Sequence, residues 1–235
     1  MPVNWIDVVV MYDLFKGYWL KSLAIGFWFI AVGYYFLLFA YIFFHRFLLK
    51  ETKLFYWFVF SLFFLFLGIG RVSNIVYDFY VPNPFYDQLG VGVNWFSIGC
   101  LAAIAGIMLI DNDKVSKLVA ILIAIPPIII GFIYPFIPAE SLAAGSILYI
   151  LFNTVILPVY GILVMSLFIY LAIQIPGDIR RKSILNTIGF LILFIGRGIY
   201  SKGARAVLGL PGDLVSIIAS SLVILSLIIF AFSTR

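Results

Sequence analysis

Seven long apolar stretches, separated by short polar connectors, follow one another along the chain. They run from about Leu20 to Phe44, Leu54 to Tyr77, Val91 to Ile110, Leu118 to Phe136, Leu142 to Ile173, Ile184 to Leu208 and Leu214 to Phe232. A helix that spans a bilayer needs about 20 predominantly apolar residues. The chain is 65% hydrophobic and 11% charged, whereas a soluble domain averages about 25% charged residues. The sequence therefore predicts an all-α integral membrane protein, a bundle of seven transmembrane helices in contact with the lipid bilayer.

The basic residues are distributed unevenly between the two sides of this predicted bundle. Nine Lys and Arg residues fall in the connectors after the first, third and fifth stretches or at the C-terminus, and four fall on the opposite side. Cytoplasmic loops carry the excess of Lys and Arg. We therefore expect a multi-pass protein of the cell membrane with its N-terminus outside and its C-terminus in the cytoplasm. The basic residues that give the net charge of +5 cluster at the ends of the predicted helices, where they orient the protein. No nucleic-acid partner is therefore expected.

An eight-residue string occurs twice in the chain. Residues 64–71, FLFLGIGR, match residues 190–197, FLILFIGR, at six of eight positions and at an offset of 126 residues. The same offset lays the first three stretches on the last three, which predicts a 3+1+3 parallel repeat. The expected organisation is an outer interfacial segment (1–19), a first three-helix repeat (20–117), a linker transmembrane helix (118–141) and a second three-helix repeat (142–235). For segment 1–19 the alternative is a disordered tail.

This plan of seven helices resembles that of the SWEET sugar transporters, and it also resembles the seven-helix sensor modules of microbes. The first resemblance implies a transporter with its site between two parallel halves. It covers the topology of the whole chain but no motif, because the sequence contains no Pro-Gln pair and only Pro158 lies within either of the two matching first helices. No family is assigned.

Each copy of the string ends in an arginine, Arg71 or Arg197, at membrane depth. A charged side chain inside a bilayer is costly and usually marks a functional site. The planar guanidinium fork of arginine suits a carboxylate or phosphate. We therefore predict that Arg71 and Arg197 bind an anion in one central cavity, together with the polar residues that follow them, Asn74, Asp78 and Tyr200. Two structural alternatives are that each arginine reaches the outer headgroups or pairs with an acidic residue.

No catalytic motif was found, so we expect no enzymatic activity. The chain has one histidine and one cysteine, which excludes a haem held by two of its own histidines and an internal disulfide. The last stretch has no lysine, which excludes a retinal Schiff base there. No cofactor and no metal site is expected.

The function that follows is the binding of a small polar or anionic solute from the outer side and its transport across the membrane. One alternative is a receptor-like sensor that signals through a membrane partner protein. The other is a structural subunit of a membrane complex. The expected partners, besides the lipid bilayer and a small anionic or polar ligand, are a membrane protein or further copies of the chain in a homo-oligomer.

Overall fold

The structure is a computed structural model that describes residues 23–49, 55–81, 83–109, 113–143, 145–174, 176–200 and 212–233. Its helices are α2 (Leu23–Leu49), α3 (Phe55–Phe79), α4 (Pro84–Leu109), α5 (Asp113–Ile133), α6 (Ile147–Tyr149), α7 (Leu157–Gln174), α8 (Asp178–Tyr200) and α10 (Gly212–Ser233). Two 3₁₀ turns, η1 (Tyr134–Phe136) and η2 (Ala139–Leu142), follow α5, and a π-helical segment, η3 (Ile150–Ile156), joins α6 to α7. The predicted outer segment 1–19 lies outside the described residues.

Seven helical segments of the described chain are long and apolar enough to cross a membrane. The predicted all-helical membrane bundle is confirmed at this level, and the protein is a multi-pass membrane protein. The helices do not end where the apolar stretches end. For example, α8 begins at Asp178 and contains Arg180, Arg181 and Lys182, because backbone hydrogen bonding can continue into the polar interface beyond the hydrocarbon region.

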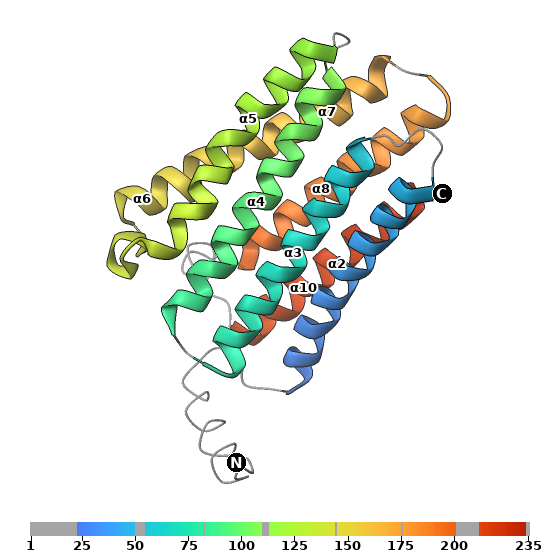
Figure 1. Cartoon of the computed structure of the whole chain (residues 1–235). Helices are drawn as coiled ribbons and strands as arrows, with labels where there is room; N and C mark the ends of the chain where they lie inside the picture. Colours follow the sequence, from blue (N-terminus) through green and yellow to red (C-terminus); the bar gives the residue numbers. More distant parts are fainter. Residues whose placement is uncertain are drawn as a thin grey trace.

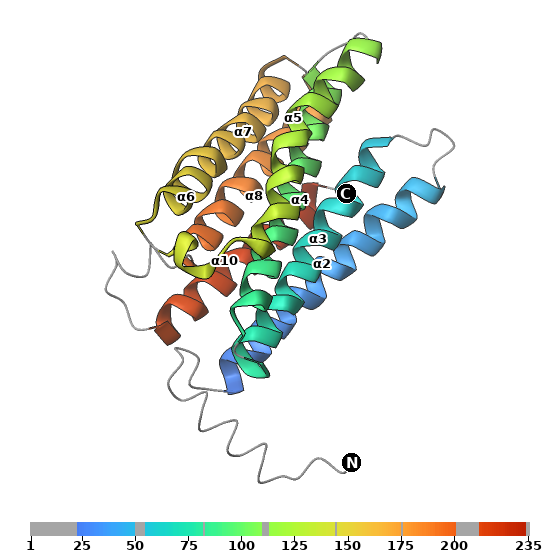
Figure 2. The same ribbon diagram turned by 60° about the vertical axis from the view of Figure 1, so that its left-hand side comes forward.

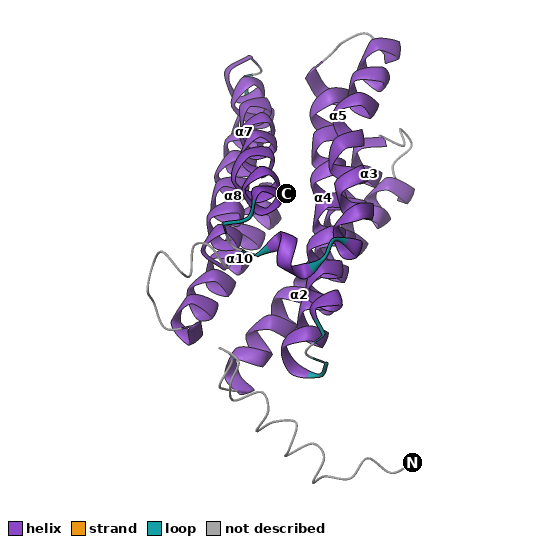
Figure 3. Ribbon diagram, turned by 90° about the vertical axis from the view of Figure 1, so that its left-hand side faces the viewer, coloured by secondary structure: helices purple, strands orange, loops and turns teal. Residues whose placement is uncertain are grey.

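Consecutive helices run up and down the bundle in turn (Figure 1). Helices α2, α3, α4 and α5 pack in chain order and are called the first helix group; α7, α8 and α10 also pack in chain order and are called the second helix group. The two groups meet where α2 contacts α10 and where α4 contacts α7. Figure 2 and Figure 3 show the second group lying against the first as a separate layer.

The α4–α5 contact is made by small residues. A Cβ added at Gly106 would lie 2.5 Å from the Cα of Ala120, and one at Gly92 would lie 2.8 Å from the carbonyl oxygen of Gly131. Lipid tails provide no hydrophobic drive between helices, so close backbone approach and dispersion hold them together. Gly92 and Gly106 of α4 therefore lie at a close helix contact.

Aromatic side chains fill the main core between the two helix groups. Phe64 of α3 and Phe190 of α8 are both fully buried, and Phe230 of α10 contacts each of them, at ring-centroid distances of 5.9 and 4.8 Å. Phe43 of α2 stacks on Phe64 with an interplanar angle of 2°. Edge-to-face and offset aromatic pairs stabilise such a core beyond the area that they bury. This core lies two helical turns before the two arginines on α3 and α8.

Candidate anion site between the helix groups

Arg71 is held inside the bundle by α2. Its side chain is only 9% exposed, and its guanidinium carbon lies 4.6 Å from the ring centroid of Phe29. Gly33 provides the space for the arginine, because a Cβ there would lie 3.2 Å from Arg71 Cγ. A cation over an aromatic face is attracted by the negative face of the ring. Arg71 therefore faces the interior of the bundle and does not extend into lipid.

Helices α3 and α4 cross closely beside this arginine through a reciprocal pair of glycines and asparagines. A Cβ at Gly70 would lie 2.6 Å from Asn94 Oδ1 and 2.9 Å from the carbonyl oxygen of Gly90. A Cβ at Gly90 would collide with Asn74 Oδ1 and lie 3.0 Å from the carbonyl oxygen of Gly70. Each asparagine thus occupies the space that the glycine of the opposite helix leaves open.

Arg197 reaches this crossing from the second helix group. It lies in the last turn of α8 and is partly buried. Its Nη1–H donates a hydrogen bond to Asn94 Oδ1 over 3.3 Å. The preceding Gly196 lets α8 approach α10, because a Cβ there would lie 3.1 Å from the carbonyl oxygen of Ala219. Asn94 therefore links the α3–α4 crossing to an arginine from the other half of the molecule.

Both arginines line one small cavity of about 40 Å³ between the two helix groups. Its walls come from α2, α3, α4, α8 and α10: Phe36, Leu67, Arg71, Asn74, Asn94, Gly196, Arg197, Ala219, Ser220 and Val223. Ser220 is 2% exposed, and its hydroxyl has no hydrogen-bond partner among the described residues. A buried polar group without a partner is costly, so Ser220 contributes an unused donor and acceptor to this cavity.

The cavity has a positive electrostatic character. The described residues that line it include two arginines and no aspartate or glutamate. The side chains of both arginines line the same cavity of about 40 Å³, so two like charges share one small space. Like charges in a space of low dielectric repel strongly, and an anion between them would relieve this repulsion. The arrangement can therefore bind an anion, and hydrogen bonds from guanidiniums to anions are among the stronger ones in proteins.

The structure brings three of the five predicted site residues, Arg71, Asn74 and Arg197, to the same cavity. The side chains of Asp78 and Tyr200 lie outside the described part of the structure. Ligand binding by any of the five stays a prediction. Among the described residues, there is no group of three or more His, Cys, Asp or Glu side chains that could hold a metal ion.

From the sequence, Asn94 was considered only as a further donor at the rim of the site, and Ser220 was not selected. Asn94 is 7% exposed, and its sequence signal is an isolated amide within an apolar helix. A second signal was available, because Ser220 lies 126 residues after Asn94. This is the same offset that relates the two arginines.

Comparisons of the chain with known protein families, with curated proteins and with solved structures found no match.

Proposed function

We propose that the chain binds a small polar or anionic solute from the outer side, in the cavity between its two helix groups, and carries it across the membrane. The observation that supports this most strongly is that Arg71 and Arg197, from different halves of the molecule, line one cavity whose described walls contain no carboxylate. Buried charges in membrane helices tend to mark the path of a substrate or an ion. The bilayer is the surrounding partner, and no cofactor is part of the proposal.

The pattern of helix contacts supports a parallel repeat in this proposal. The repeat matches α2, α3 and α4 with α7, α8 and α10. The contacts α2–α3 and α3–α4 then correspond to α7–α8 and α8–α10, and the contact α2–α10 corresponds to α7–α4. Helices α3 and α8 also run in the same direction (Figure 1). The offset of 126 residues pairs Arg71 with Arg197 and Asn94 with Ser220, and all four line the cavity. A site at the interface of two repeats is a common design of secondary transporters.

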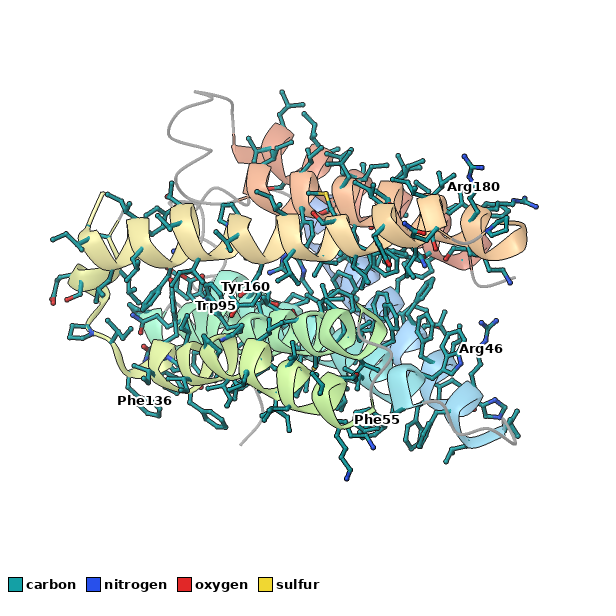
Figure 4. The ribbon with its side chains drawn as sticks, turned by 90° about the horizontal axis from the view of Figure 1, so that it is seen from above. Arg46, Phe55, Trp95, Phe136, Tyr160 and Arg180 are labelled. Atoms are coloured by element: carbon teal, nitrogen blue, oxygen red, sulfur yellow. The ribbon has the colours of Figure 1, made fainter. Side chains whose placement is uncertain are left out.

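The distribution of basic residues supports access from the outer side. Arg46 and Arg180 belong to the connectors that we assign to the cytoplasm, and they lie at the same end of the bundle (Figure 4). Arg71 and Arg197 lie toward the opposite ends of α3 and α8. If the basic end faces the cytoplasm, the cavity lies in the outer half of the membrane.

A structural role for the arginines is the second candidate, and two contacts favour it. Arg71 lies over the ring of Phe29, and Arg197 donates to Asn94. These contacts could serve only to hold α2, α3, α4 and α8 together in a subunit of a membrane complex. The two roles differ in whether an anion binds.

An efflux experiment with matched arginine variants separates these roles. Proteoliposomes loaded with chloride, nitrate, formate or sulfate should release at least one of these anions faster than protein-free vesicles. Arg71→Gln and Arg197→Gln should slow this release strongly, and Arg71→Lys should also slow it because a point charge cannot replace the fork. A lost hydrogen bond to a charged group costs about 1.5–3 kcal/mol, or roughly ten- to a hundredfold in affinity.

Arg181→Gln is the control, since Arg181 is exposed on α8, in the basic segment at which that helix begins. It should release the anion at the wild-type rate. Transport by this site is excluded if no anion is released faster than from empty vesicles, or if the Gln variants fold and release it at the wild-type rate.

A further inference from the structure

The dimensions of the cavity restrict the kind of solute. A cavity needs about 10–15 Å³ to hold one water molecule, so a volume of about 40 Å³ holds roughly three water-sized atoms or groups. Because bonded atoms lie closer together than separate water molecules, an ion of up to about four non-hydrogen atoms is compatible with this space. A sugar, an amino acid or a nucleotide is much larger than the cavity.

The walls of the cavity leave little room for it to widen. On one side, the α3–α4 crossing brings Gly70 and Gly90 into close backbone approach, and on the other Gly196 packs against the backbone of Ala219. Phe36 and Leu67 close it toward the aromatic core, and both are nearly completely buried. Close-packed interiors resist expansion.

The polar groups of the cavity favour an anion over a neutral molecule of the same size. Two guanidiniums supply N–H donors that are permanently charged. Of the two asparagines in the wall, Asn94 accepts the hydrogen bond of Arg197 through Oδ1, and the buried Oδ1 of Asn74 has no partner among the described residues. The buried hydroxyl of Ser220, which has no partner among the described residues, can turn its proton toward an anion. Water could fill the same space, but it would not offset the repulsion between two positive charges.

We propose that the solute is a small monovalent anion of about four non-hydrogen atoms or fewer, of the class of chloride, formate or nitrate, bound between Arg71 and Arg197 with the Ser220 hydroxyl as a further donor. This inference rests on the proposed function and specifies its substrate class. Sulfate, phosphate and organic acids of larger size belong to the excluded classes.

Thermal unfolding of the purified chain tests this size limit. The protein is kept in detergent with gluconate as the only anion, and gluconate is replaced by chloride, formate, nitrate or sulfate at constant ionic strength. A ligand that binds only the folded state raises its stability, so Tm should rise in a saturable way with at least one of the three small anions and stay unchanged with sulfate.

Two variants of residues in the cavity wall sharpen the test. Ser220→Ala should weaken the small anion about tenfold or more, which is the effect of removing one hydrogen bond to a charged group. Val223→Ala should enlarge the cavity, since Val223 lines it and is 1% exposed. This variant should respond to pyruvate, to which the wild type should not respond.

The outcomes distinguish this inference from the proposed function. A rise in Tm with sulfate but with none of the small anions, lost in Arg71→Gln, would overturn the size limit and leave an anion site in place. A wild-type response to small anions in Ser220→Ala would show that the Ser220 hydroxyl does not bind the anion. The absence of any anion effect, with water filling the cavity, would overturn both proposals.

Discussion

Replacing Gly90 with alanine should loosen the helix crossing on which the candidate site is built. The new Cβ would collide with Asn74 Oδ1 and lie 3.2 Å from Asn74 Cγ and 3.0 Å from the carbonyl oxygen of Gly70. The first contact is with a side chain that can rotate, but the last is with backbone. Helices α3 and α4 must therefore separate by a few tenths of an ångström, which would also displace Asn94 from Arg197.

The size of the expected drop in melting temperature follows from a comparison with Gly198→Ala. Nothing described lies within 4 Å of a Cβ at Gly198, which is also in a membrane-spanning helix. Both variants gain the helix propensity of alanine over glycine, about 0.8–1.0 kcal/mol, so this gain cancels between them. The difference that remains is the overpacking in Gly90→Ala, which costs about 1–3 kcal/mol of stability. At about 2–4 °C per kcal/mol for a chain of this size, Gly90→Ala should melt about 2–12 °C below Gly198→Ala.

Thermal unfolding followed by intrinsic fluorescence in detergent measures this difference. Adding Asn74→Ala to Gly90→Ala should recover part of the loss, since the side-chain collision disappears while the backbone contact with Gly70 remains. Equal melting temperatures for Gly90→Ala and Gly198→Ala would refute the close crossing of α3 and α4.

Two further predictions concern the orientation and the core. In a Cys100→Ala background, a cysteine at the exposed position Asn83 should react with an impermeant thiol reagent in intact cells. A cysteine at the exposed position Arg181, on the basic side that we assign to the cytoplasm, should react only after lysis. The reverse labelling pattern would invert the orientation. Phe190→Ala should destabilise the fold by up to about 3–5 kcal/mol, because Phe190 is fully buried against Phe230. Leu191→Ala, on the exposed face of the same helix, should change Tm little, and equal losses in the two variants would contradict the packing of α8.

The membrane class and the spans could be predicted from the sequence because a bilayer imposes a simple requirement. Every backbone polar group in it must be satisfied internally, so a long apolar stretch is almost always a helix. Helix ends were less predictable, and α8 begins six residues before its apolar stretch, at Asp178, because the bilayer constraint ends at the interface. Topology relative to the two sides of the membrane remains a prediction from the basic residues.

The candidate site was predictable in part. The two arginines could be found because charge in an apolar helix is costly and because the string repeats. The central place of Asn94 in the site was harder to predict, since it depends on the crossing of α3 and α4, and this crossing is set by glycines on both helices. The spacing of residues along one helix does not determine which glycine of another helix it meets.

The most direct measurement of the central claim is the position of a bound anion in a crystal of the protein grown in bromide. Anomalous scattering should place a bromide in the cavity between Arg71 and Arg197, beside the Ser220 hydroxyl, and this peak should disappear in Arg197→Gln. A cavity that holds only water, with both guanidiniums bonded entirely to protein groups and bromide only at the protein surface, would contradict the account.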